Sequence, residues 1–288
     1  MRAIKFVRIS ILLLPCCIVM ARANAQHAKQ SLNSIHEAEM EISTKTVHYK
    51  PIFGEGDDSK KIMKAIKRFA QLSVDPKGKS KMVKYGREEL AYYVLSGTGM
   101  LHYGNTDMPI SKNDFFYIPI GTNHGFSNPR EDTITMLVMG VEIPKDTVVK
   151  PTPDLKIASA NDMAFQMLSK SHGPSSKYQL LMGTTRSIRD RLASANQISS
   201  LFVIDFEPGG TNIPHKHKDE EEIYYMLEGN GEMVAGESAE GKEVRFPVKK
   251  GDAFFYAPNT LVGFYSPTKP ETEHTRILAV RVKYPGQK

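Results

Sequence analysis

The chain of 288 residues contains no tryptophan and only two cysteines, the adjacent Cys16 and Cys17. Both cysteines lie in the N-terminal stretch 1–25, which we expect to be removed from the mature protein. The mature protein would then have no thiol, which excludes a disulfide framework and a thiol nucleophile. The sequence also lacks an apolar run of comfortable transmembrane length at its N-terminus, because residues 9–20 are fewer than the roughly 20 that a spanning helix needs.

Residues 1–25 have the three parts of a secretory signal peptide. Positive side chains come first, the apolar run 9–20 follows, and small residues at positions 23 and 25 precede Gln26. We therefore expect the protein to be exported, to the periplasm or out of the cell. The alternative is that this apolar run is a buried N-terminal strand or helix.

The charge of the chain is concentrated in the same stretch. The formal net charge is +6, and four of these positive charges are Arg2, Lys5, Arg8 and Arg22. The mature chain is therefore near +2, and the basic isoelectric point does not indicate a nucleic-acid partner. The sequence predicts no stable membrane span after cleavage of the signal.

The most informative feature is an internal repeat. Residues 88–99 align with residues 220–231 at a shift of 132 positions, and residues 113–119 align with 251–257 at a shift of 138. Each copy consists of short aromatic and β-branched runs separated by Gly, Pro, Asn and Asp, which is typical of an all-β barrel or sandwich. The repeat predicts two similar β domains, residues 26–143 and 155–288, with a linker at 144–154.

One cluster in the second copy has the spacing of metal ligands. His215 and His217 flank a single residue, and Glu222 follows after four more. Because side chains of a strand alternate between its faces, both imidazoles should share one face. A turn at residues 218–219 should then return the next strand antiparallel, with Glu222 opposite the pair. Two imidazoles and a carboxylate suit a divalent transition metal and leave positions open for water or substrate.

This cluster, flanked by Gly209 and Gly229, resembles the first motif of the cupin superfamily at every specified position. The later part of the second cupin motif is present in the first copy, at 119–121, His124 and Asn128. The resemblance implies a two-domain cupin, or bicupin, built from tandem double-stranded β-helix (jelly-roll) barrels. It also implies a metal site at His215, His217 and Glu222, with iron or manganese preferred and zinc, nickel or copper as alternatives.

Each copy departs from the family pattern in a complementary way. In the first copy, the ligand positions hold Val83, Tyr85 and Leu90, so we expect the N-terminal domain to bind no metal. In the second copy, the usual fourth ligand, a histidine, is replaced by Val262. His124 of the first copy is expected to pack in its barrel with a local hydrogen bond.

Several alternatives remain for the residues of the site. The motif could be a solvated charged hairpin, and Glu220 or Glu221 could supply the carboxylate instead of Glu222. Tyr224 should share the face of Glu222, where it is a candidate acid, base or orienting donor, although packing in the core explains it equally well.

Cupin resemblance does not determine the reaction. The leading hypothesis is a metal-dependent enzyme that acts on a small polar or carboxylated molecule, of the dioxygenase, decarboxylase, isomerase or aminohydrolase type. The rival hypothesis is a non-catalytic binding protein with a vestigial metal site. The family resemblance also suggests a homodimer.

Overall fold

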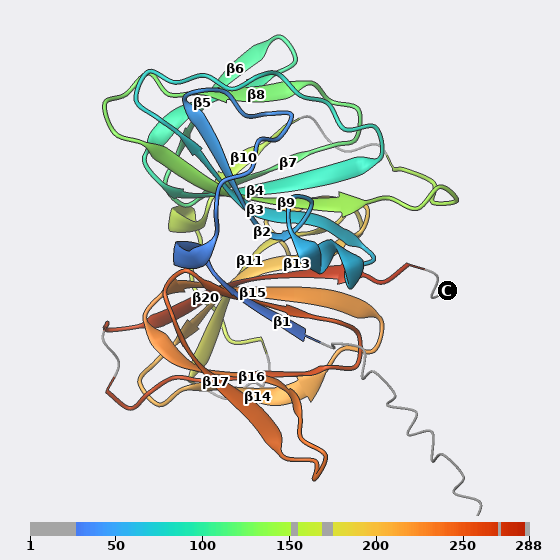
Figure 1. Ribbon diagram of the computed structural model, residues 1–288, viewed down its shortest axis with the longest axis vertical. Helices are drawn as coiled ribbons and strands as arrows, with labels where there is room; N and C mark the ends of the chain where they lie inside the picture. Colours follow the sequence, from blue (N-terminus) through green and yellow to red (C-terminus); the bar gives the residue numbers. More distant parts are fainter. Residues whose placement is uncertain (1–26, 151–154, 169–174, 270–271, 286–288) are drawn as a thin grey trace, which may run out of the picture.

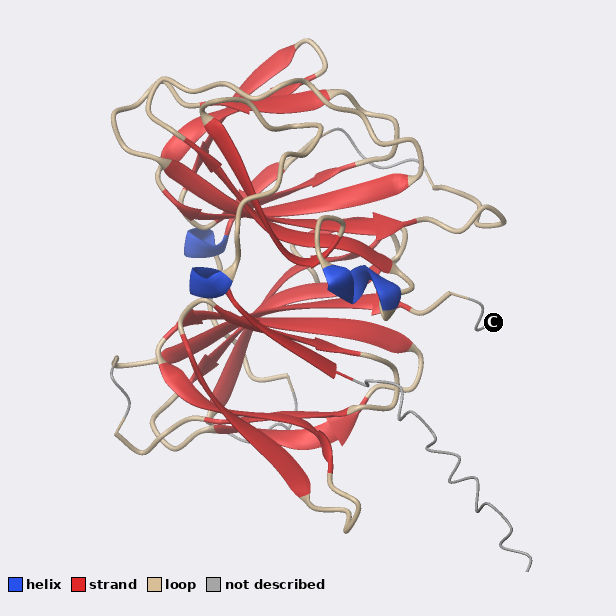
Figure 2. Ribbon diagram, in the orientation of Figure 1, coloured by secondary structure: helices blue, strands red, loops and turns tan. Residues whose placement is uncertain are grey.

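The computed structural model describes residues 27–150, 155–168, 175–269 and 272–285, and these form two β-barrels that lie one above the other (Figure 1). Strands dominate both barrels, and the helical elements of the described part are short 3-10 turns (Figure 2). These are η1 (Leu32–Ser34), η2 (Asp58–Lys61) and η3 (Ala160–Asp162). No helix within the described ranges has the length and apolar content needed to cross a membrane. The expected signal peptide lies outside the described residues.

The first barrel has a large and a small sheet. The large sheet has the order β10-β7-β4-β9-β3-β2 and the small sheet the order β6-β5-β8. Their bounds are β2 (Val47–Gly54), β3 (Ile66–Val74), β4 (Glu88–Ser96), β5 (Thr98–Tyr103), β6 (Thr106–Ser111), β7 (Asp114–Ile118), β8 (His124–Ser127), β9 (Ile134–Glu142) and β10 (Ile157–Ser159).

The second barrel repeats this plan. Its large sheet has the order β1-β18-β15-β20-β13-β11-β12, and its small sheet the order β14-β19-β16-β17. The bounds are β1 (His27–Ser31), β11 (Ser176–Thr184), β12 (Leu192–Ala195), β13 (Ile198–Phe206), β14 (Thr211–Lys216), β15 (Glu220–Glu228), β16 (Asn230–Glu237), β17 (Glu243–Lys249), β18 (Asp252–Tyr256), β19 (Leu261–Tyr265) and β20 (Thr275–Lys283). The all-β, two-barrel prediction is confirmed.

Alternation along the central strands produces three hydrophobic cores. In β15, Tyr224 and Met226 point into the second barrel, whereas Ile223 and Tyr225 point toward the first. Tyr92 and Tyr93 of β4 divide in the same way. The two large sheets therefore pack face to face in the middle of the molecule, and each barrel has a core of its own (Figure 1).

Two short strands cross between the barrels, which differs from the expected division of the chain. The sequence division places β1 in the first domain, but this strand pairs with β18 of the second barrel. The same division places β10 in the second domain, but this strand pairs with β7 of the first barrel. Each crossing strand covers a sheet edge that would otherwise expose unpaired backbone groups.

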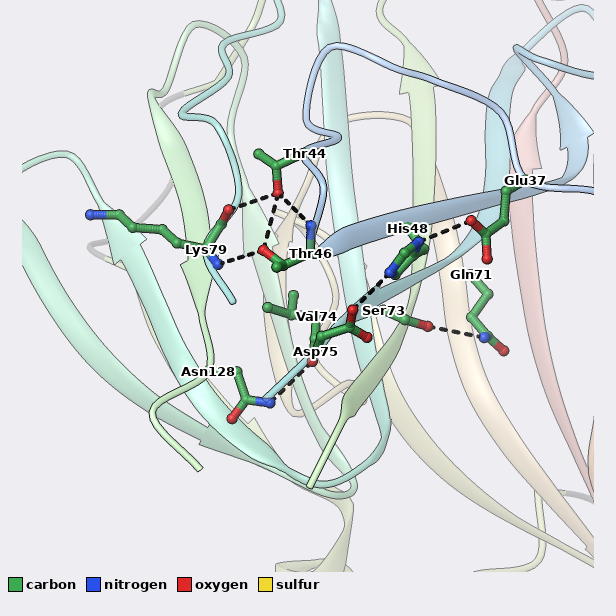
Figure 3. Close-up of polar contacts among 10 residues, drawn as sticks. All are labelled: Glu37, Thr44, Thr46, His48, Gln71, Ser73, Val74, Asp75, Lys79 and Asn128. Atoms are coloured by element: carbon green, nitrogen blue, oxygen red, sulfur yellow. Dashed lines mark hydrogen bonds and ion pairs between the residues drawn. The ribbon is translucent and has the colours of Figure 1, made fainter. Parts of the chain in front are cut away.

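The segment before β2 makes polar contacts with residues of the first barrel (Figure 3). The His48 Nδ1 and Nε2 atoms each lie 2.9 Å from a carboxylate oxygen, of Glu37 and Asp75 respectively. Asn128, the last residue of the second cupin motif, is buried and donates to the backbone carbonyls of Val74 and Asp132.

The contacts of His48 predict a pH dependence of stability. The hydrogen bond to Asp75 and the two carboxylates raise the pKa of His48 above its ordinary value of 6.5. Protonated His48 therefore stabilises the fold. This contribution is fully present below pH 6.5 and is lost as the pH rises through the pKa of His48 in the folded state. We expect chemical denaturation between pH 6 and 8 to show this decline, and His48→Gln to reduce it. An unchanged pH profile in that variant would contradict the prediction.

Candidate metal centre

The three predicted ligands come together at one end of the second barrel. His215 lies near the end of β14 and His217 directly follows that strand, whereas Glu222 lies near the start of β15. The Nε2 atoms of the two imidazoles are 3.0 Å apart, and His217 Nε2 lies 3.5 Å from Glu222 Oε2. The charged-hairpin alternative does not describe this arrangement, because Glu222 is only 1% exposed.

The route by which the ligands meet differs from the sequence expectation. Strands β14 and β15 are not antiparallel neighbours, because β14 pairs with β19 and β15 pairs with β18 and β20. The two strands belong to opposite sheets of the barrel. The turn between them crosses the barrel mouth, so the imidazoles approach Glu222 from the facing sheet.

The structure distinguishes the three consecutive glutamates of β15. Glu222 points into the second barrel, and Glu221 points toward the first barrel, where it accepts hydrogen bonds from backbone N–H groups. Glu220 is partly exposed, and its Oε2 lies 3.7 Å from His217 Nδ1. Glu222 is therefore the carboxylate that faces the two imidazoles.

The charged form of Glu222 is unfavourable in this position. Both of its oxygens are buried and have no hydrogen-bond partner among the described residues. Burial raises the pKa of Glu222 to about 8, although the positive charge of Arg281 lowers it. A buried carboxylate without partners is costly, and a bound cation would compensate it.

The imidazole nitrogens fit a metal in chemistry and spacing. His215 Nδ1 lies 2.8 Å from the carbonyl oxygen of Ile213, which orients the ring with Nε2 toward His217. Two ligand atoms bound at right angles to one ion, each at about 2.1 Å, are about 3 Å apart, which is the spacing of the two Nε2 atoms. Within the described ranges, however, no group of three or more His, Cys, Asp or Glu side chains is already arranged to hold a metal. A bound metal would take the place of the contact between the two imidazoles and would need Glu222 as its third ligand.

A comparison with protein families identifies the fold. The cupin domain model matches residues 72–140 and 202–279, which together are more than half of the chain. The chain belongs to the cupin family. The two matches, one in each barrel, show that it is a two-domain cupin.

Solved structures with low sequence identity have the same two-barrel fold. A glyoxylate-induced protein of Pseudomonas aeruginosa has a TM-score of 0.71 at 15% identity, with 91% of each chain covered. Protein YlbA of E. coli has a TM-score of 0.67 at 13% identity, over 92% of this chain and 94% of that one. Oxalate decarboxylase of Lactobacillus farciminis, as a formate complex, has a TM-score of 0.65 at 13% identity, over 89% and 86%. At these identities the likeness establishes the fold alone.

One curated relative matches a short part of the cupin. An uncharacterized protein of Methanocaldococcus jannaschii is 42% identical over 52 residues, which are 18% of this chain and 37% of that protein. The matched stretch therefore spans little more than a third of the relative.

The remaining predicted site residues lie deeper in their barrels. Tyr224 is 1% exposed, and its hydroxyl accepts a hydrogen bond of 2.9 Å from the Asn212 amide. Burial raises the pKa of Tyr224 well above its usual value. This environment favours packing and orientation over proton transfer. Val262, in place of the fourth ligand, is buried and pairs with His215 in the sheet.

In the first barrel of the cupin, His124 is fully buried and makes local contacts. Its Nε2 atom lies 2.9 Å from the Tyr92 hydroxyl, and burial lowers the pKa of His124 to about 4. Leu90, which occupies the position of Glu222, packs in the barrel core. The expected local hydrogen bond of His124 is present.

One polar residue of the site was absent from the sequence predictions. Arg281 of β20 pairs with Glu222 across the sheet, and its Nε lies 3.7 Å from Glu222 Oε1. Its guanidinium also lies over the ring of Phe202, 5.0 Å from the centroid. Sequence alignment could not identify Arg281, because Gly140 occupies the corresponding position of the first barrel, opposite Leu90.

Proposed function

We propose that the second barrel binds a divalent transition metal through His215, His217 and Glu222, and that the protein is a metal-dependent enzyme. Its substrate in this proposal is a small polar or carboxylated molecule. Iron or manganese are the preferred ions, and zinc, nickel or copper the alternatives. We also propose that the protein is exported, as residues 1–25 predict.

A single observation carries the proposal. The carboxylate of Glu222 is almost completely buried, makes no hydrogen bond with any described residue, and faces the Nε2 atom of His217. A carboxylate in such a place needs a cation, and neutral imidazoles supply the other ligands that transition metals prefer. When bound, a divalent ion at this position would act as a Lewis acid toward an oxygen of the substrate.

The chain's own residues would position the reacting groups. The carbonyl oxygen of Ile213 holds the His215 ring, and the Asn212 amide holds the Tyr224 hydroxyl. Because Tyr224, Phe254 and Tyr256 are buried in the barrel core on the sheet face of Glu222, the proposal confines the substrate to the barrel mouth. This confinement, together with the fold shared with oxalate decarboxylase, supports a small substrate.

A second candidate is a non-catalytic binding protein. Val262 replaces the fourth ligand, and the described side chains are not prearranged as a metal group. In this alternative the two imidazoles remain hydrogen-bonded to each other and the site is vestigial.

Elemental analysis of the purified protein distinguishes the two functions. We expect about one transition metal per chain, and loss of that metal in the His215→Ala/His217→Ala double variant. His102→Ala is the matched control, because His102 contacts Asp107 and Ser127 in the first barrel and lies far from the site in the fold. A metal-free wild-type protein of normal stability, or a double variant that retains its metal, would overturn the enzyme proposal.

A further inference from the structure

A row of polar side chains crosses the large sheet beside the candidate metal centre. Ser200 of β13 pairs with Arg281 of β20, and Arg281 pairs with Glu222 of β15. Directly paired residues of antiparallel strands point to the same face of the sheet. Phe202, two residues after Ser200, belongs to the core of the second barrel, so this face is the interior one.

Four buried atoms of this row have no hydrogen-bond partner in the part of the chain that the structure describes. The Oγ of Ser200, the Nε of Arg281 and both oxygens of Glu222 are buried and make no hydrogen bond with the described residues. Ser200 is only 2% exposed, and the side chain of Arg281 is 23% exposed. The two ion pairs of Arg281, with Glu222 and Glu220, are long, at 3.7 and 3.8 Å. Neighbouring donors that are buried and unpaired are rare in folded proteins and indicate a ligand or ordered water.

The first barrel shows how an arginine at this place is satisfied when no ligand is needed. There Arg68 of β3 pairs with Gly140 of β9 and extends over it. In the second barrel the small residue, Ser200, is on the earlier strand and the arginine is on the later one. Its Nε and Nη2 donate to the two oxygens of Glu88, at 2.5 and 3.1 Å, and its guanidinium covers the ring of Tyr85. Arg68 is 4% exposed, so this ion pair is largely buried in the first barrel.

In the second barrel, Glu220 is the counterpart of Glu88, but it lies 3.8 Å from the guanidinium of Arg281, and the Arg281 Nε makes no hydrogen bond with the described residues. A guanidinium presents its donors in a planar fork that matches a carboxylate, and the two short bonds that Arg68 makes with Glu88 show this geometry within the same chain. A divalent ion at the neighbouring ligands would add positive charge to a site that already has Arg281, and the site would then attract anions.

We propose that Arg281 is the carboxylate-binding residue of the second barrel, with Ser200 as an additional donor, so that the ligand is a small carboxylate anion. This inference rests on the proposed metal site, because it assigns the substrate class of that site. One carboxylate group lies on the guanidinium fork, and the rest of the small molecule faces His215 and His217. The carboxylate supplies the acceptors that the unpaired donors of Arg281 and Ser200 need.

Calorimetric titration with matched probes tests the assignment. Glycolate is compared with ethylene glycol, and oxalate with oxamide, on the purified metal-loaded protein. We expect the anions to bind and the neutral molecules of similar shape to bind at least tenfold more weakly. Arg281→Met should weaken anion binding by about 10- to 100-fold, the effect of a lost charge-assisted pair. Arg281→Lys keeps the positive charge but loses the planar fork of donors, so its affinity for the anions should lie between those of the wild type and Arg281→Met. Ser200→Ala should weaken anion binding by a few-fold.

The metal content of every variant is measured in parallel, and circular dichroism confirms that each variant is folded. Arg276→Met is the matched control, because Arg276 lies on the same strand but pairs with Asp205. Anions that bind the wild type no better than the neutral probes, or that bind Arg281→Met and Arg281→Lys as tightly as the wild type, would overturn the assignment. If these results are obtained with a normal metal content, only the carboxylate assignment fails and the proposed metal site stands. A wild-type protein without metal would instead show that the proposed metal site fails.

Discussion

Replacing Glu221 with glutamine is expected to lower the free energy of unfolding by roughly 2–4 kcal/mol, because charge-assisted hydrogen bonds are lost at a buried place. Glu221 is completely buried between the barrels. Its Oε1 accepts from the backbone N–H of Lys64 at 2.6 Å, and its Oε2 from those of Ala65 and Ile66 at 3.0 Å. An amide offers one oxygen instead of two, and its NH2 group would face a backbone donor.

The repeat supplies an independent second example of this contact. Glu89, the counterpart of Glu221 in the first barrel, accepts from the N–H groups of Asn196, Gln197 and Ile198 at 2.7, 2.7 and 3.0 Å. Each barrel thus uses one buried carboxylate to bind the start of a strand in the other. Glu89→Gln should therefore destabilise the protein by a similar amount.

Denaturant unfolding followed by far-ultraviolet circular dichroism measures this effect, since the chain has no tryptophan for fluorescence. Glu220→Gln is the matched control, because Glu220 is adjacent and partly exposed, and its ion pairs with His217 and Arg281 are long, at 3.7 and 3.8 Å. We expect the control to change the unfolding free energy by less than about 1 kcal/mol. Equal unfolding midpoints for Glu221→Gln and Glu220→Gln would show that the carboxylate does not join the barrels.

The fold and the grouping of the candidate ligands could be predicted from the alternation along strands and from the internal repeat. Alternation along β15 places Glu222 and Tyr224 on one face and Glu221 on the other, and a repeat of 132 positions shows that the plan occurs twice. The repeat also aligns Glu89 with Glu221. The sequence does not indicate, however, that these two carboxylates are buried and bind backbone groups of the other barrel.

The remaining features depend on pairing between distant strands. Strand β1 is five residues long and largely polar, so nothing in its composition indicates that it covers β18 of the far barrel. Arg281 comes beside Glu222 only through the register of β20 against β15, at a separation of 59 positions in the sequence. Likewise, the crossing of β14 to the opposite sheet depends on which strands pair, and spacing along the chain does not determine that.

Replacing Glu222 with leucine is expected to change metal binding and stability in opposite directions. The variant copies the first barrel, where Leu90 occupies the same position and is 1% exposed within the core. Removing one of three proposed ligands should weaken metal binding by more than about 100-fold, which exceeds the usual effect of changing an outer contact of a metal site. Removing a buried carboxylate that makes no hydrogen bond within the described part of the chain should stabilise the metal-free protein by about 1–3 kcal/mol.

The two effects are separable because bound metal stabilises only the wild type. The metal content of both proteins is therefore measured first. The metal is then removed with a chelator, and the free energy of unfolding is measured by denaturant titration of the metal-free proteins. Glu222→Gln is the matched control: it keeps an oxygen ligand and a polar group without partners, so both its metal loss and its gain in stability should be smaller. A leucine variant that retains metal would exclude Glu222 as a ligand. One that unfolds more readily than the metal-free wild type would show that the contacts of Glu222 with His217 and Arg281, at 3.5 and 3.7 Å, already compensate its burial.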